Sequence, residues 1–190
     1  MFIQTEQTPN PEVLKFLPGR EVMGEGTREF ATADDAAASP LAADLFAIDG
    51  VVRVFFGPDF LTVTKAGPAV EWGHLKAPVL AAIMDHFTSG APLLSDDDGA
   101  ATHTGGDYEG ETAQIVAEIK ELLDTRIRPA VAQDGGDILF SRFEADTGVV
   151  FLHMRGACSG CPSSSATLKA GVENMLKHYV PEVTRVEQTL

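Results

Sequence analysis

The sequence predicts two small α+β domains joined by a flexible, acidic linker rich in Gly, Ser and Asp. The chain has 190 residues, which is enough for two small hydrophobic cores. Residues 89–110 contain no Lys or Arg, and such a composition cannot bury enough apolar surface to offset the entropy of ordering. On both sides of this segment, apolar runs typical of strands lie beside the four-residue apolar spacing typical of helices. We therefore place the domains at residues 1–88 and 111–190, with the linker at 89–110.

The first domain is expected to combine short strands with two helices. A strand should end at Pro18-Gly19, and a β-hairpin should turn at Gly57-Pro58-Asp59. The expected elements are a strand at 14–17, a helix at 41–48, hairpin strands at 51–56 and 61–64, and a second helix with Leu75, Val79, Ile83 and Phe87 on one face.

The second domain is expected to open with a helix that Thr112 could cap. Helical sequence continues until Asp134-Gly135-Gly136 interrupts it, and a hairpin should follow across Asp146-Thr147-Gly148. The remaining expected elements are the end of the helical stretch at 127–133, hairpin strands at 138–142 and 149–154, a final helix at about 162–178 and a last strand at 183–186.

Charge and hydropathy exclude several classes of partner. The formal net charge is -14, and an acidic surface repels nucleic-acid phosphates and anionic lipids. The longest apolar runs, such as residues 51–56, are far shorter than the roughly 20 residues that span a bilayer, and the N-terminus has no secretory pattern. We expect a soluble protein that binds neither nucleic acid nor membrane. Its expected location is the cytoplasm of a bacterium, or the mitochondrial matrix for a processed eukaryotic protein.

The chain has only two cysteines, Cys158 and Cys161, and they lie in a loop that leaves a strand and enters a helix. Pro162 suits the first position of that helix, because its missing N–H would have no intrahelical partner. Both sulfurs should therefore lie near the positive end of the helix, which favours thiolates and anionic ligands. Gly156 and Gly160 let the backbone approach the sulfurs closely.

Two thiolates do not complete a four-ligand metal site, so three arrangements are open. The cysteines could cycle through a disulfide, histidines could complete a site, or two chains could each supply two thiolates. His153 is the histidine nearest in sequence, but its position in an alternating strand favours a structural or exposed histidine over a ligand. The two-chain arrangement needs only the residues present and gives an exposed site. A thioredoxin domain is disfavoured, because the pair lies too near the C-terminus to be followed by enough strands.

Three segments of the second domain share a family pattern: Arg128-Pro129, Asp134-Gly135-Gly136-Asp137, and residues 156–164 around the cysteines. The first domain adds Gln4-Thr5, Thr8-Pro9-Asn10-Pro11, Lys15-Phe16 and Pro18-Gly19. With these motifs, nearly the whole chain resembles the Nfu-type iron–sulfur cluster scaffolds and carriers, whose second domain is similar to the C-terminal domain of NifU.

The resemblance implies a cluster that bridges a homodimer through Cys158 and Cys161 of each chain, with 4Fe-4S favoured over 2Fe-2S. It also implies upstream cluster donors, transfer to apo iron–sulfur client proteins, and no enzymatic activity. Gly156, Gly160, Pro162 and Asp137 would support the cluster loop. A zinc-bridged module and a thiol–disulfide oxidoreductase are the alternatives.

Two motifs have both a structural and a functional interpretation. The Asp134–Asp137 turn could serve only as a turn, or it could pack against the cysteine loop and shape the cluster pocket. The segment Thr8-Pro9-Asn10-Pro11 could be a rigid turn or a surface that recognises clients.

Overall fold

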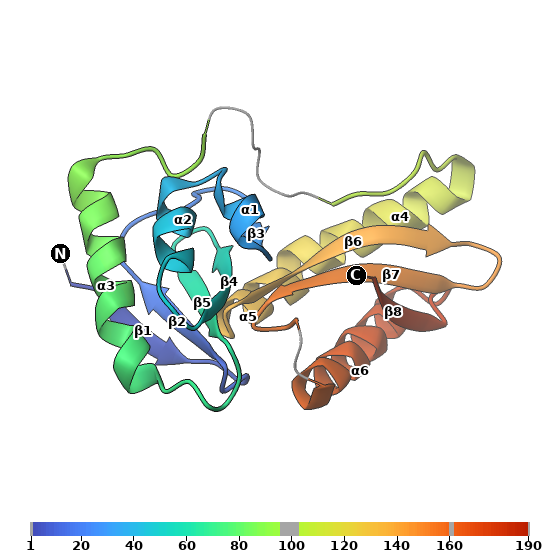
Figure 1. The fold of residues 1–190 in the computed structure, drawn as a ribbon. Coiled ribbons are helices and arrows are strands. Elements are labelled where there is room, and N and C mark those ends of the chain that lie inside the picture. Colours follow the sequence, from blue (N-terminus) through green and yellow to red (C-terminus); the bar gives the residue numbers. More distant parts are fainter. Residues whose placement is uncertain (1, 96–102, 160–161, 190) are drawn as a thin grey trace. The chain divides into compact units, whose positions relative to one another are not determined.

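Two separate hydrophobic cores organise the chain. Figure 1 shows the helices and strands that contribute to them. The structure is a computed structural model that describes residues 2–95, 103–159 and 162–189. It divides into two units, residues 1–101 and 102–190, and each unit combines helices with one sheet. The expectation of two small α+β domains is confirmed.

The first unit is built on a five-stranded antiparallel sheet with the order β1-β2-β5-β4-β3. Its strands are β1 (Gln4–Gln7), β2 (Val13–Leu17), β3 (Arg28–Phe30), β4 (Val51–Phe56) and β5 (Leu61–Lys65). Its helices are α1 (Ala33–Ala36), α2 (Pro40–Phe46) and α3 (Trp72–Ser89).

Alternation along the strands gives the first unit one apolar sheet face for its helices. Phe16, Val54 and Val63 lie on that face, and they share a core with Leu45 of α2 and Val79 of α3. The hairpin and both longer helices were predicted. The edge strands β1 and β3 were not, because each is short and lacks a clear apolar alternation.

The second unit has a three-stranded sheet with the order β6-β7-β8. Strands β6 (Gly136–Glu144) and β7 (Val149–Gly156) form the expected antiparallel hairpin. Helix α6 (Pro162–Tyr179) then returns the chain to β8 (Arg185–Thr189), which pairs in parallel with β7. The last strand was expected two residues earlier.

The helices of the second unit share one core with the inward-facing residues of its sheet. Ile119 of α4 (Gly110–Leu122) and Leu176 of α6 are fully buried together with Phe140, Leu152 and Val186 of the three strands. This single core makes the sheet and its helices one cooperative unit.

A short π-helix, η1 (Leu123–Ile127), joins α4 to α5 (Arg128–Gln133). The expected helix start was wrong. Glu109 rather than Thr112 occupies the N-cap, and its side chain makes no capping hydrogen bond. Thr112 lies inside α4, because the helix already begins at Gly110.

The expected linker differs at both of its described ends. The Ser95 N–H donates to the Ala38 carbonyl, and Leu93 and Leu94 pack against the first core. Beyond residues 96–102, which lie outside the described residues, His103 and Thr104 are hydrogen-bonded to β6. The composition of this segment predicted a flexible linker. It could not predict these contacts, because composition carries no information about individual hydrogen bonds. In the described parts of the chain, no helix is both long enough and apolar enough to cross a membrane.

Gly148→Ala should destabilise the second unit by about 2–4 kcal/mol. Gly148 has a φ of 70°, and a Cβ there would overlap the backbone carbonyl of Glu182. Gly171→Ala is the matched control, because its Cβ would meet no atom within 4 Å. Because Gly171 lies in the interior of α6, its replacement by alanine should raise the free energy of unfolding by about 0.5–1 kcal/mol. Urea unfolding followed by circular dichroism measures both, and equal stability of the Gly148 variant and the wild type would contradict this turn.

Candidate functional site

Cys158 follows the end of β7 in a tight turn. Gly156, the last residue of the strand, has a φ of 63°, a conformation that favours glycine. Its carbonyl accepts the Ser159 N–H at 3.1 Å and the Ser159 hydroxyl at 2.9 Å. Gly156 therefore closes the turn that carries the first cysteine. Gly160 and Cys161 lie outside the described residues.

The start of α6 at Pro162 agrees with the expected position of this proline at the first turn of the helix. The second cysteine therefore directly precedes the helix in the sequence. The expectation of an exposed site does not hold for Cys158, which is only 6% exposed and belongs to the core of the second unit. A thiol packs as a small apolar side chain, so an apolar core accommodates it.

The turn before β6 packs directly against Cys158. A Cβ added to Gly136 would overlap the Cys158 sulfur and would lie 2.9 Å from the Arg155 carbonyl oxygen. The Ala157 N–H donates to the Gly135 carbonyl at 3.1 Å. The interpretation in which the Asp134–Asp137 turn packs against the cysteine loop is therefore the one that the structure shows. Glycine is required at position 136 because the sulfur occupies the space of a side chain.

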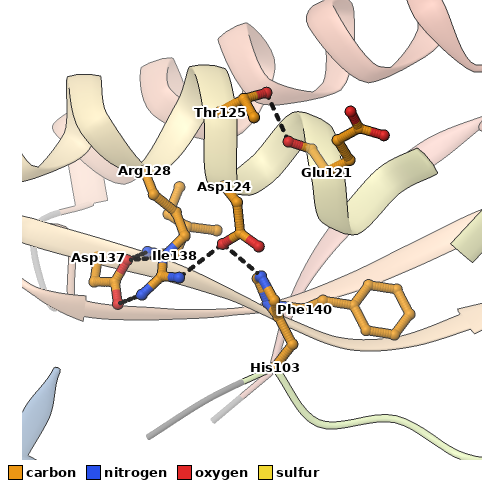
Figure 2. A network of polar contacts seen from close by, with 8 residues as sticks. All are labelled: His103, Glu121, Asp124, Thr125, Arg128, Asp137, Ile138 and Phe140. Carbon is orange, nitrogen blue, oxygen red and sulfur yellow. Dashed lines mark hydrogen bonds and ion pairs between the residues drawn. The ribbon is translucent and has the colours of Figure 1, made fainter. Parts of the chain in front are cut away.

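Asp137 directly follows that glycine and forms a two-pronged ion pair with Arg128 (Figure 2). Arg128 donates from Nε to Oδ1 at 2.8 Å and from Nη2 to Oδ2 at 3.0 Å. The Ile138 N–H also donates to Oδ1 of Asp137. The pair ties the start of α5 to the start of β6, so Asp137 fixes the strand that contacts Cys158.

Two further residues extend this network (Figure 2). Arg128 also donates to Asp124 at 2.7 Å, and the same oxygen of Asp124 lies 2.9 Å from Nε2 of His103. The Phe140 N–H donates to Nδ1 of His103 at 2.8 Å. Sequence reasoning did not assign Asp124 and His103 to the site. The spacing of Asp124 and Arg128, four residues apart in a helical stretch, could have indicated their ion pair.

The network shifts the proton affinities of its members. Desolvation alone would raise the pKa of Asp124, but hydrogen bonds from Arg128 and His103, together with the positive charge of Arg128, lower it below its ordinary value of 3.8. Desolvation alone would lower the pKa of Arg128, but its bonds to Asp137 and Asp124 raise it. Both residues therefore stay charged through the neutral pH range.

The described histidines are engaged elsewhere or do not gather into a metal site. His153 makes a 2.9 Å hydrogen bond to the Thr189 hydroxyl, in agreement with the structural role expected for it. Within residues 2–95, 103–159 and 162–189, no group of three or more His, Cys, Asp or Glu side chains could hold a metal ion. A histidine-completed site has no support from this part of the chain.

The Thr8-Pro9-Asn10-Pro11 segment forms a hydrogen-bonded turn between β1 and β2. The Thr8 hydroxyl donates to the Asn10 carbonyl at 2.8 Å, and Oδ1 of Asn10 accepts the Glu12 N–H. The indole N–H of Trp72 donates to the Pro11 carbonyl at 3.1 Å. These contacts agree with a rigid turn, while client recognition at this turn stays a prediction.

Comparison with known proteins identifies both halves of the chain. Residues 3–90 match the family model described as "Scaffold protein Nfu/NifU N terminal", and residues 119–187 match the "NifU-like domain". The fold and the cysteine turn thus define a two-domain protein of the Nfu/NifU type.

Relatives similar over almost the whole chain point to one family. The chain is 55% identical over 99% of its length to NifU-like protein 4, mitochondrial, of Arabidopsis thaliana, and covers 66% of that protein, about two thirds. It is 55% identical to NifU-like protein 5, mitochondrial, of the same plant over 99% of its length, covering 68% of it. It is 51% identical over its full length to the human NFU1 iron-sulfur cluster scaffold homolog, mitochondrial, and covers 72% of it. The chain belongs to the family of these NifU-like and NFU1 proteins.

Gly136→Ala should loosen the cysteine loop. The added Cβ would compete with the Cys158 sulfur for one space, so the loop has to move outward. We expect alkylation of Cys158 in the folded protein to become about tenfold faster. Gly171→Ala, which adds a Cβ in open space of the same unit, should leave the rate unchanged. Peptide mass spectrometry after timed alkylation measures both, and an unchanged rate for the Gly136 variant would refute the contact.

Asp124→Asn should destabilise the protein in a pH-dependent way. The lowered pKa means that the carboxylate stabilises the fold above its unfolded-state value near 3.8, and that this contribution is lost as pH falls through the folded-state pKa. Because the side chain is 45% exposed, solvent screening limits the effect to roughly 0.5 kcal/mol at neutral pH. Urea unfolding at neutral pH and at a pH below the folded-state pKa should show the difference from wild type disappearing in acid. A difference that is constant with pH would contradict a charged role.

Proposed function

We propose that this protein is an iron–sulfur cluster scaffold and carrier rather than an enzyme. Two subunits hold one cluster through Cys158 and Cys161 of each chain, with 4Fe-4S favoured over 2Fe-2S. The cluster is cargo, received from upstream donors and passed to apo iron–sulfur proteins. The proposal rests on membership of a family whose human member is named an iron–sulfur cluster scaffold, and on the turn that carries Cys158.

Counting ligands supports the two-chain arrangement. Common iron–sulfur clusters take four thiolates, and the chain contains two cysteines. The single observation that carries the proposal is the placement of this pair. Cys158 lies in a glycine-closed turn at the end of β7, and Cys161 directly precedes the first residue of α6. The partial positive charge of a helix N-terminus stabilises a thiolate–cluster anion.

The burial of Cys158 gives the loop two functions. The Cys158 sulfur fills the space above Gly136, where it is shielded from oxidants. To bind a cluster, the loop turns the sulfur outward, away from Gly136. During transfer, each iron–thiolate bond to this chain is replaced by one to the client, and the oxidation state of the cluster does not change. The Gly156 turn provides the freedom for this movement.

The location and partners follow the same reasoning. The relatives named above are mitochondrial, which agrees with the matrix alternative and gives no support to the cytoplasmic one. The formal charge of -14 favours protein clients over nucleic acid. The proposal includes the expected division of the chain into a first domain at residues 1–88, a linker at 89–110 and a cluster-binding domain at 111–190. Both cysteines lie in the last of these segments.

Anaerobic reconstitution with iron and sulfide tests this function. The wild type should become brown and dimeric, with two cysteines per chain engaged. Cys158→Ala and Cys161→Ala should each lose colour and dimer. His153→Ala is the control that should retain both, because its ring is bonded to Thr189 instead. Mössbauer spectroscopy and size-exclusion chromatography measure cluster type and assembly.

Two outcomes would replace the proposal. A colourless protein that dimerises on zinc would indicate a zinc-bridged module, because Zn²⁺ is d¹⁰ and also accepts four thiolates. A reversible intramolecular disulfide with reductase turnover and no metal requirement would indicate a thiol–disulfide oxidoreductase.

A further inference from the structure

The segment before α4, residues 103–108, lies along the edge strand of the second sheet. We call this segment the strap. The Thr104 N–H donates to the Phe140 carbonyl at 2.9 Å, and the Phe143 N–H donates to the Tyr108 hydroxyl at 2.8 Å. Strand β6 lies at the edge of the sheet in the order β6-β7-β8, so the strap satisfies backbone groups on its outer edge.

The strap packs closely as well as forming hydrogen bonds. The rings of Tyr108 and Phe140 meet edge to face with centroids 6.4 Å apart. A Cβ at Gly105 would lie 2.8 Å from the Phe140 ring and 3.2 Å from the Ser141 carbonyl oxygen. Glycine therefore allows the strap to approach the strand at this point.

His103 bridges the strap to two elements at once. Its Nδ1 accepts the Phe140 N–H of β6, and its Nε2 lies 2.9 Å from Asp124 of η1. A neutral ring with hydrogen on Nε2 satisfies both contacts, since it accepts at Nδ1 and donates at Nε2. The His103 side chain is 12% exposed, so packing as well as hydrogen bonds holds the ring in place.

The contacts continue from His103 to the cysteine turn without a gap. Asp124 accepts from both His103 and Arg128, and Arg128 holds Asp137 in its two-pronged pair. Asp137 directly follows Gly136 in the chain, and Gly136 is the residue that contacts the Cys158 sulfur.

We infer that His103 is a positioning residue for the cysteine loop, acting through Asp124, Arg128 and Asp137 on the strand that contacts Cys158. The strap thereby belongs to the cysteine-bearing unit. This unit extends upstream of the NifU-like match, which begins at residue 119, and of the boundary expected from composition at residue 111. Its effect on cluster retention rests on the proposed function, whereas its effect on Cys158 in the apo protein does not.

Three substitutions at one position separate the two contacts of the ring. His103→Gln places an amide nitrogen near the position of Nε2 and keeps the contact with Asp124. His103→Asn places an oxygen near the position of Nδ1 and keeps the contact with the Phe140 N–H. His103→Ala loses both. Because the inference runs through Asp124, we expect the Gln variant to resemble the wild type and the Asn variant to resemble the Ala variant.

The first measurement is the alkylation rate of Cys158 in the folded, apo, full-length chain, read by peptide mass spectrometry. His103→Ala and His103→Asn should react about twofold to threefold faster than wild type, as expected when a contact with the half-exposed carboxylate of Asp124 is lost. Tyr108→Phe is the matched control in the same strap. It removes the hydroxyl that accepts the Phe143 N–H but leaves the contacts of His103, so its rate should stay that of the wild type.

Amide hydrogen exchange at Ile119 and Val186 distinguishes a local effect on the cysteine loop from a general destabilisation of the unit. Both residues belong to the core of the second unit but not to the loop. These amides should exchange at the wild-type rate in all variants while Cys158 reacts faster. The inference is overturned if His103→Ala leaves the Cys158 rate unchanged, if His103→Gln reacts as fast as His103→Ala, or if Tyr108→Phe accelerates the reaction equally. Equal acceleration at Ile119 and Val186 would overturn it too.

A second measurement connects the inference to the cluster. In the reconstituted chain, His103→Ala should lose its cluster to a chelator faster than wild type by the same factor, while His103→Gln should not. If the wild type takes up no cluster, the proposed function fails, but the alkylation result stands. If the wild type is loaded and alkylation does not respond to His103, the positioning role fails and the proposed function stands.

Discussion

The ion pair between Arg128 and Asp137 is the interaction on which the second unit depends. Asp137 is almost fully buried, and both of its oxygens accept from the guanidinium. A buried charge that loses its partner costs several kcal/mol, so this pair fixes α5 relative to the first residues of β6. The position of Gly136 follows, and with it the space that receives the Cys158 sulfur. A charged pair away from the cysteines thus determines where one of them rests.

A carrier has conflicting requirements, because it must hold a cluster and also release it. In this chain the start of β6, held by the ion pair of Asp137, lies directly against the turn that carries Cys158. Cys158 is packed in the core of the second unit. Under the proposed function, a cluster that engages this sulfur has to outweigh its packing, which lowers the net binding free energy and suits transfer to a client.

Local patterns predicted most of the secondary structure. Apolar alternation located the hairpin strands, four-residue spacing located α3 and α6, and glycines marked the turns. The errors arose where a local rule competed with tertiary contacts. Thr112 is a good capping residue, yet α4 begins before it. The strap has the composition of a linker, yet β6 binds it. Cys158 was expected at the surface, but the space above Gly136 buries it.

Sequence patterns were sufficient to predict the two-domain α+β organisation, the cysteine spacing and the family, because each of these depends on composition or on residues close together in the chain. The surroundings of the cysteine turn instead depend on tertiary contacts. His103 bonds to the backbone of Phe140, 37 positions later, and lies against Asp124, 21 positions later. No periodic pattern encodes contacts at such separations. They exist only because the sheet edge, the π-helix and the strap meet when the second core forms.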